Sequence, residues 1–419
     1  MDFQPDKSFA QQLDLNDKLK SYRDKFFIPK KPNGEDVIYF AGNSLGLQPK
    51  TVRQYVEQEL KDWETLGVEG HSNAKNPWLP YHEFLTEQTA RLVGAKSDEV
   101  VNMNSLTVNL HLMLVSFYRP TKERHRILIE ANAFPSDHYA VQSQINFHGF
   151  DVETSLLEMK PREDEKTLRT EDIESFIEKE GDSIALIWFA GVNYYTGQAF
   201  EFERITKAGH KKGCIVGFDL AHAAGNLFLN IHDWNVDFAV WCSYKYLNGG
   251  PGAIGGAYVH EKHLQDKSLP KFWGWWGQNK QTRFSMGHEF DAIPTVESWQ
   301  LSNPPILQLA SLKASLDIFD EAGMKALREK SEMLTSYLEY LINEKNNSTI
   351  EIITPPDLKQ RGCQLSLRAK ANGKEIHQRL NDSGVICDWR EPDVIRVAPV
   401  PLYNTFEDVW KFVEILFKK

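Results

Sequence analysis

Two short segments of the chain end in an acid and a base that could act together. Asp219 follows the apolar segment 213–218, and Lys245 follows the apolar segment 237–243. Lys245 stands 26 positions after Asp219, about the length that a short helix and a return strand need in an α/β sheet. Both side chains are therefore expected at the same edge of one sheet.

An amine and a carboxylate placed in this way suit the chemistry of pyridoxal phosphate (PLP). The lysine forms a Schiff base with the cofactor aldehyde, and the carboxylate keeps the pyridine nitrogen protonated, so that the ring accepts electrons. Either residue alone says little, because isolated lysines are usually surface charges and an Asp after a strand is usually a helix cap. The position of Lys245, between a strand-like apolar run and the glycine-rich segment 249–252, favours the catalytic interpretation.

Composition limits the class of protein. The chain has 419 residues, of which 41% are apolar and 25% charged, as is typical of a globular protein of about two domains. A net charge of -10 disfavours nucleic acid as a partner and leaves small molecules. No apolar run approaches the roughly 18 residues of a membrane-spanning helix, and the first 20 residues show no secretion signal. We expect a cytoplasmic protein with no membrane partner.

Strand-like and helix-like patterns alternate from residue 60 to 295, which predicts a mostly parallel sheet covered by helices on both faces. After Asn303-Pro304-Pro305, a long amphipathic helix at 306–319 leads into a smaller α+β module. We therefore predict a segment 1–59 that packs on the small domain and a partner subunit, a large cofactor-binding domain at 60–295, and a small C-terminal domain at 296–419.

Two further segments place polar groups where a strand gives way to a helix, at 104–107 and 133–138. The free backbone N–H groups of such a helix start and the Thr107 hydroxyl could hold a phosphate, although a Ser/Thr helix cap is the ordinary alternative. Phe134 could stack on the pyridine ring or belong to the core. Both segments are expected at the same sheet edge as Lys245.

For two features of the chain, the sequence allows either an internal partner or a ligand. The aromatic run 271–277 suits either core packing or an aromatic ligand. Arg396 lies inside an apolar strand pattern and needs an anion if it is buried. A substrate carboxylate would fit its planar guanidinium, and an internal Asp or Glu is the competing partner.

Two segments are similar to the motifs of other classes of site, and both of these interpretations are rejected. Segment 250–255 matches GxGxxG, but a strand-like segment follows it, and Trp275 stands where a dehydrogenase would need an acid. The segment His260-Glu261-Lys262-His263 is not HExxH, so a surface charge cluster is expected there and no metal site.

With these motifs in place, the chain resembles the kynureninases, members of the aspartate-aminotransferase-like fold type I of PLP enzymes. The similar motifs follow one another in order along nearly the whole chain: Gly42-Asn43-Ser44-Leu45-Gly46-Leu47, Leu106-Thr107-Val108-Asn109-Leu110-His111, Phe134-Pro135-Ser136-Asp137-His138-Tyr139, Gly217-Phe218-Asp219-Leu220-Ala221-His222, Trp241 to Asn248, Ser302-Asn303-Pro304-Pro305 and Arg396-Val397-Ala398-Pro399.

The resemblance implies a cofactor site and a homodimer with shared active sites. Lys245 would bind the cofactor, Asp219 would pair with its ring nitrogen, and His222 would lie beside Asp219. Trp275 and Asn303 would reach the site from the neighbouring subunit, and Ala190 stands where relatives often have a hydroxyl residue. The remaining cofactor contacts would be Phe134 over the ring, Pro135, and a group around the phosphate: Leu106, Thr107, Ser136, Asp137 and Tyr244.

The resemblance also implies a reaction of the kynurenine pathway of tryptophan degradation and NAD biosynthesis. L-kynurenine or 3-hydroxy-L-kynurenine would be cleaved hydrolytically to anthranilate or 3-hydroxyanthranilate and L-alanine, with Lys245 moving the α proton and Tyr244 relaying a proton. Arg396 would bind the α-carboxylate. The residues facing the aryl ring would be His71, Ser44 and Asn303, a eukaryote-type pattern linked to the 3-hydroxylated substrate.

Other functions compete with this one. A cysteine desulfurase needs a nucleophilic Cys on a mobile loop, whereas Cys363 and Cys387 have strand-like surroundings. An aminotransferase of the same fold is a further alternative. An inactive relative that only binds a ligand is disfavoured by the joint presence of Asp219, Lys245 and Arg396.

Overall fold

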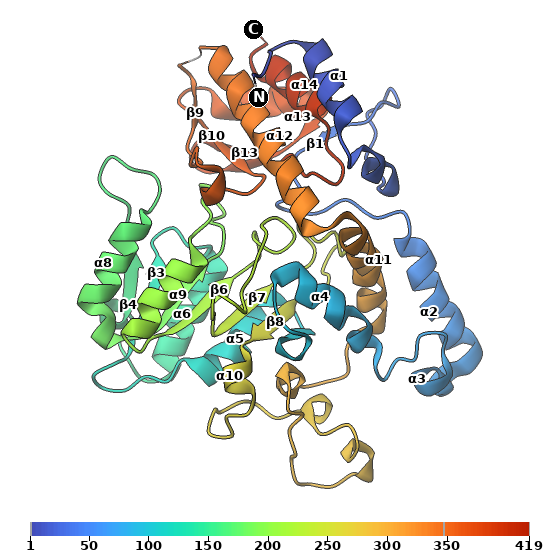
Figure 1. Cartoon of the computed structure of the whole chain (residues 1–419), viewed down its shortest axis with the longest axis vertical. Coiled ribbons are helices and arrows are strands. Elements are labelled where there is room, and N and C mark those ends of the chain that lie inside the picture. The colour runs from blue at the N-terminus through green and yellow to red at the C-terminus, as the bar shows by residue number, and fades with distance from the viewer. Residues whose placement is uncertain (1, 347, 419) are drawn as a thin grey trace.

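The computed structural model of the chain describes residues 2–346 and 348–418. Its larger part is built on a seven-stranded sheet, and a smaller part with a four-stranded sheet lies above it in the view of Figure 1. Among the described residues, no helix combines the length and the apolar composition needed to cross a membrane. The predicted combination of a large α/β part with a smaller α+β part is confirmed.

The large sheet is mostly parallel. Its strand order is β2-β8-β7-β6-β5-β3-β4, and β8 alone runs antiparallel to both of its neighbours. The strands are nearly continuous apolar runs because both faces of the sheet are buried. Their bounds are Val100–Asn102 (β2), Arg126–Glu130 (β3), Leu156–Met159 (β4), Ile184–Ala190 (β5), Ile215–Asp219 (β6), Phe238–Trp241 (β7) and Gly256–Val259 (β8).

Helices cover both faces of this sheet and form a separate hydrophobic cluster on each. One cluster takes residues from α4, α8, α9 and α11, and the other from α5 and α6. Helices α7 and α10 are single turns between the larger elements. The bounds are Thr86–Val93 (α4), Leu106–Phe117 (α5), Pro135–Phe147 (α6), Val152–Ser155 (α7), Thr170–Glu180 (α8), Phe202–Lys211 (α9), Glu261–Leu264 (α10) and Ile306–Ala322 (α11).

The connection between Asp219 and Lys245 differs from the prediction, since it contains no helix. Turns at 221–226 and 231–235 lead directly into β7. Gly225 adopts a left-handed backbone with φ +77°, and Leu247 lies 2.7 Å from where a Cβ would stand on it. A left-handed residue ends a helical turn, so the buried chain folds back in irregular turns instead.

The smaller part is an antiparallel sheet covered by helices, and the N-terminal segment packs on it. Its strand order is β12-β13-β10-β9, while β1 pairs in parallel with β11 and α1 packs on α14. The bounds are Lys7–Asn16 (α1), Ile38–Tyr39 (β1), Met324–Glu344 (α12), Ile350–Ile352 (β9), Leu365–Ala369 (β10), Gly373–Asp382 (α13), Val385–Ile386 (β11), Asp388–Arg390 (β12), Val394–Val397 (β13) and Phe406–Leu416 (α14).

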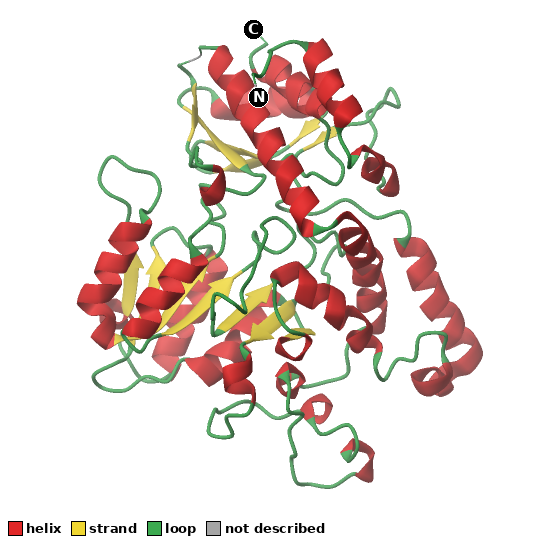
Figure 2. Ribbon diagram, in the orientation of Figure 1, coloured by secondary structure: helices red, strands yellow, loops and turns green. Residues whose placement is uncertain are grey.

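Two peripheral regions complete the fold. Helix α2 (Val52–Leu66) packs on α11 and leads to the short helix α3 (Gly70–Asn73). The segment between α10 and α11 projects from the bottom of the molecule in Figure 2 as a long loop with short helical turns. This projecting loop carries the aromatic run 271–277: Trp276 is buried, whereas Trp273 is 71% exposed and Trp275 44%.

Candidate active site

Asp219 and Lys245 line one cleft at the edge of the large sheet, as predicted. The cleft encloses about 510 Å³ including its mouth. Its lining combines residues from the ends of neighbouring strands and the starts of two helices, as expected for a ligand site in an α/β sheet. The lining residues are Leu106, Thr107, Phe134, Ser136, Asp137, Ala190, Val192, Tyr194, Asp219, Ala221, His222, Tyr244 and Lys245.

Local hydrogen bonds hold the acid and the base in place. Asp219 is the last residue of β6, and its Oδ1 accepts the Ala221 backbone N–H at 2.6 Å. Lys245 lies on the turn after β7, where its carbonyl accepts the Asn248 N–H at 3.0 Å and the Tyr244 carbonyl accepts the Gly46 N–H at 2.8 Å. The turn that carries Lys245 is therefore fastened to the N-terminal segment.

Three buried carboxyl groups, Asp219, Asp137 and Glu130, cluster at the bottom of the cleft. Burial raises the pKa of Asp219, and the Lys245 charge opposes that rise. Burial and the Asp219 charge raise the pKa of Asp137 well above its usual range, which favours the neutral form of Asp137. Burial raises the pKa of Glu130 to about 8. The cluster thus keeps its negative charge on Asp219, opposite the Lys245 amine.

The starts of α5 and α6 meet at one wall of the cleft and suit a phosphate. The two hydroxyls, Thr107 Oγ1 and Ser136 Oγ, lie 2.9 Å apart. Neither helix has a side-chain cap, since the Ser105 side chain makes no capping hydrogen bond and Phe134 at the N-cap of α6 has no acceptor. The ordinary alternative, a Ser/Thr cap, is thus absent here, and the first N–H groups of α5 remain available to an anion. At the start of α6 only the Ser136 N–H does so, because Pro135 has no N–H and the Asp137 N–H donates to the Phe134 carbonyl.

The remaining groups of the cleft fit a PLP molecule. His222 Nδ1 and Asp137 Oδ1 are buried and have no hydrogen-bond partner among the described residues. Burial lowers the pKa of His222 well below its usual range, so its ring is neutral. Phe134 is 43% exposed, and its ring centroid lies 5.8 Å from Lys245 Nζ. An amine, an anionic acid, an anion-binding wall and an aromatic face are thus assembled around one space.

Comparisons with known proteins decide the family. A family model described as the kynureninase C-terminal domain matches residues 327–416. The kynureninase of Myxococcus xanthus is 60% identical over 414 residues, which cover 99% of this chain and 97% of that protein. The kynureninase of Rattus norvegicus is 52% identical over 430 residues, covering 98% and 92%. The chain belongs to the kynureninase family.

Solved structures with a similar fold support the predicted architecture of this kynureninase-family chain. A cysteine desulfurase from Thermococcus onnurineus aligns with a TM-score of 0.74 at 19% identity, over 90% of this chain and 93% of that one. A cysteine desulfurase from Escherichia coli aligns with a TM-score of 0.75 at 16% identity, over 95% and 97%. At such identities the likeness concerns the fold alone. All four cysteines of the present chain are buried, which disfavours desulfurase chemistry.

In this kynureninase-family chain, the structure shows which groups bind Arg396. Arg396 is buried in β13 and pairs with Asp388, which lies directly opposite on β12. Its Nη1 also donates to the Tyr194 carbonyl at 2.9 Å. Ser44 contributes its hydroxyl to the same ion pair. The internal acid is present, and the carboxylate-binding role of Arg396 stays a prediction.

Six predicted site residues do not line the cleft of a single chain: Pro135, Ser44, Arg396, His71, Trp275 and Asn303. His71 on α3 stands with its Nδ1 3.0 Å from the Val68 carbonyl. Trp275 contacts neighbouring aromatic rings on the projecting loop, and Asn303 is exposed just before α11. Their contributions to the site stay predictions, as do those of the residues that line the cleft.

Sequence reasoning missed several residues at the site: Glu130, Val192, Tyr194 and Asp388. Glu130 is the last residue of β3, so the rule that strand ends meet at one edge could have found it. Asp388 had no such signal, because its role depends on strand pairing inside the small part.

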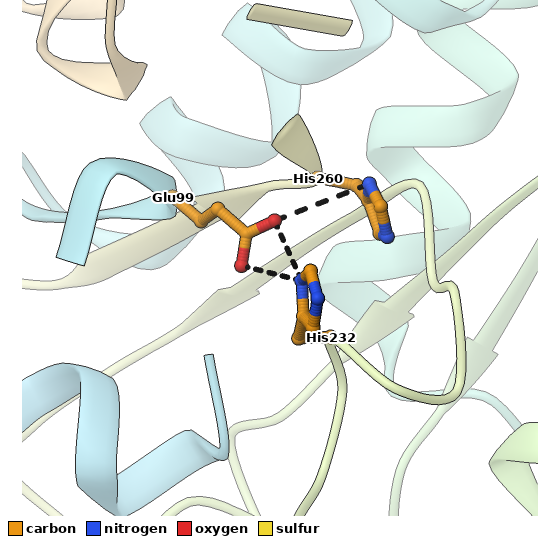
Figure 3. Close-up of side chains that lie close together, drawn as sticks. All are labelled: Glu99, His232 and His260. Carbon is orange, nitrogen blue, oxygen red and sulfur yellow. Dashed lines mark hydrogen bonds and ion pairs between the residues drawn. The ribbon is translucent and has the colours of Figure 1, made fainter. Parts of the chain in front are cut away.

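Glu99, His232 and His260 lie close together (Figure 3), which corrects the prediction of a surface charge cluster at 260–263 for His260, whereas Glu261 and Lys262 are exposed as expected. His260 is buried, and Glu99 is completely buried. The Glu99 carboxylate accepts the Glu261 backbone N–H at 2.7 Å and His232 Nδ1 at 2.9 Å, while His260 Nδ1 accepts the Lys262 N–H at 3.2 Å. The segment is a structural hydrogen-bond network that ties α10 to the start of β2.

Proposed function

We propose that this chain uses PLP to cleave the Cβ–Cγ bond of L-kynurenine or 3-hydroxy-L-kynurenine with water. The products are anthranilate or 3-hydroxyanthranilate and L-alanine. The observation that carries the proposal is the convergence of Asp219 and Lys245 in one cleft of a chain that is 60% identical to a kynureninase. Membership of the family makes the chain an enzyme, a PLP-dependent hydrolase of the kynurenine pathway.

Lys245 has two tasks in this proposal. Its amine would hold the cofactor, and in the reaction the same amine would take the α proton of the substrate. When bound, PLP supplies an electron sink that stabilises negative charge on the substrate carbons. Asp219 keeps the pyridine nitrogen protonated, and the neutral His222 lies beside it.

Tyr244 acts as a proton relay in the proposal. Burial raises the pKa of Tyr244, so its hydroxyl keeps its proton at neutral pH. The hydroxyl can donate this proton to Cβ of the alanine product when the Cβ–Cγ bond breaks. The hydroxyls of Thr107 and Ser136 and the starts of α5 and α6 bind the phosphate. Leu106, Pro135 and Asp137 complete the cofactor contacts, and Phe134 covers the ring.

We propose that the working unit is a cytoplasmic homodimer with shared sites. Trp275 and Asn303 would enter the cleft of the neighbouring subunit. Support comes from the projecting loop, whose Trp273, Phe284 and Met286 are 71%, 57% and 70% exposed in the single chain. Large apolar side chains exposed together on one segment indicate a surface that a partner covers.

A kinetic experiment tests the proposed reaction. Purified protein with PLP should release fluorescent anthranilate from L-kynurenine, and Lys245→Ala should abolish this turnover because no other amine lines the cleft of the described chain. Lys122→Ala, at an exposed lysine, is the matched control and should keep full activity. A Lys245→Ala variant that still cycles would contradict the assignment of the base.

The substrate preference is a separate prediction. His71, Ser44 and Asn303 match the pattern linked to 3-hydroxykynurenine, so kcat/KM should be higher for the hydroxylated substrate. Steady-state kinetics with both compounds measure the ratio. A clear preference for plain kynurenine would refute the aryl-ring assignment and leave the reaction itself untouched.

A further inference from the structure

The ion pair of Arg396 and Asp388 lies behind Tyr194, a residue of the cleft wall. Arg396 has its guanidinium carbon 6.0 Å from the ring of Tyr194, a residue that lines the cleft. Its Nη2 binds Asp388, and the Ser44 hydroxyl donates to the same carboxylate oxygen. The Arg396 side chain is only 1% exposed and that of Asp388 20%. A resident acid therefore holds the guanidinium before any substrate arrives.

A second arginine stands next to this pair. Arg390 is two residues from Asp388 on β12, so both side chains lie on one face of the strand. Arg390 Nη2 is 3.5 Å from Asp388 Oδ2. The Nε groups of Arg390 and Arg396 are both buried and have no hydrogen-bond partner among the described residues. The cluster has two cations for one anion. A second carboxylate could accept hydrogen bonds from the unused donors.

We propose that Asp388 is a positioning residue that occupies the carboxylate site between turnovers and yields it to the α-carboxylate of the substrate. The inference rests on the proposed function, in which Arg396 binds that carboxylate. One carboxylate exchanges for another: the substrate takes the Arg396 donors, and Asp388 keeps its charge paired through Arg390. No bond other than hydrogen bonds changes.

The exchange has a direct physical consequence. When no substrate is bound, a buried guanidinium without an anion would be strongly unfavourable. Asp388 therefore keeps Arg396 charged and in place. The incoming carboxylate must then compete with Asp388 and approach its negative charge. Asp388 should thus weaken carboxylate binding, whereas Arg390, which receives the displaced acid, should strengthen it.

Equilibrium binding of L-alanine to the PLP-loaded protein tests the proposal without turnover. The change in cofactor absorbance on titration with L-alanine reports affinity, and L-alaninamide, which has no carboxylate, is the matched control ligand. Asp388→Asn should tighten L-alanine binding about tenfold, because like-charge repulsion is removed while an acceptor for Arg396 remains. L-alaninamide binding should not change, and Asp388→Glu should restore the weaker binding of L-alanine.

Arg390→Gln provides the second arm, and it should weaken L-alanine binding about tenfold. Opposite effects of Asp388→Asn and Arg390→Gln support the exchange. Unchanged or weaker binding of L-alanine to Asp388→Asn, with a far-ultraviolet spectrum like that of the wild type, overturns it. If Asp388→Asn does not fold, unchanged binding to Arg390→Gln overturns it instead. Failure of the proposed function shows separately, as absence of anthranilate release by the wild type.

Discussion

The three carboxyl groups beneath the cleft show how single residues set the charge of the site. Asp137 and Asp219 interact electrostatically, and Glu130 ends β3, which β5 separates from β6, with its carboxylate oxygens 3.3 Å from the Ala190 backbone N. A second full negative charge so close to Asp219 would be costly in a buried site. Glu130 and Asp137 are expected to stay protonated, so that the cofactor ring meets a single anion.

The raised pKa of Glu130 predicts how the stability of the fold depends on pH. Its folded pKa of about 8 lies above the ordinary 4.5, so between these values the folded protein binds more protons than the unfolded chain. Stability from this group is complete below about pH 4.5 and is lost as the pH rises towards 8. Glu130→Gln stays neutral, and its free energy of unfolding should rise relative to that of the wild type by about 1 kcal/mol per pH unit in this window.

Denaturant unfolding of the apoprotein at several pH values between 5 and 8 measures this difference. Glu64→Gln, at an exposed acid, serves as the control and should follow the wild type. Parallel curves for Glu130→Gln and the wild type would mean that Glu130 is ionised in the folded protein.

At the scale of elements, the turn that carries Lys245 depends on a segment far away in sequence. Gly46 packs against this turn so closely that a Cβ at this position would contact Asn248 Oδ1 and the Lys245 carbonyl and would lie 2.8 Å from Asn248 Cα. Most of these contacts are backbone atoms that cannot move aside without shifting Lys245. The motif from Gly42 to Leu47 thus positions the base and does not itself line the cleft.

Gly46→Ala should therefore weaken PLP binding by at least about tenfold and destabilise the fold by about 1–3 kcal/mol. Fluorescence titration with PLP gives the affinity, and thermal unfolding gives the stability. Gly287→Ala is the matched control, because a Cβ there meets no atom within 4 Å. Equal PLP affinities for both variants would show that the turn tolerates the shift.

At the scale of the whole molecule, the proposed homodimer would complete the site. Trp275 lies on the projecting loop, outside the cleft of its own chain, and the proposal assigns it to the neighbouring cleft. The division at residues 59 and 295 stays a prediction at this scale. In the structure, α11 packs on α2 and α4, while α12 packs on α14.

Mixed dimers test the shared site. Lys245→Ala lacks the base and Trp275→Ala lacks the residue given to the partner, so each variant alone should be inactive or strongly impaired. A mixed dimer has one intact site of two, so the doubly tagged fraction should show about half of wild-type activity. Co-expression of differently tagged chains, followed by anthranilate assays of the doubly tagged fraction, measures this restoration. No gain over the separate variants would contradict a site shared between subunits.

The sequence alone determined the main elements and the central pair of the site. Apolar runs that alternate with helical patterns predict a parallel sheet, and the ends of its strands meet at one edge whatever the details of packing. That is why Asp219, Lys245 and the helix starts at Leu106 and Pro135 could be placed together from their spacing. The family resemblance, confirmed by the comparisons, added the reaction.

Only the tertiary structure decided which buried charges pair. The partner of Arg396 follows from the register of β12 and β13, and the burial of His260 follows from Glu99, a residue far away in the chain. The short helix expected after Asp219 gave way to turns because the buried chain packs tightly around Gly225. Strand register and burial depend on contacts between distant segments, and local patterns of residue types contain no record of them.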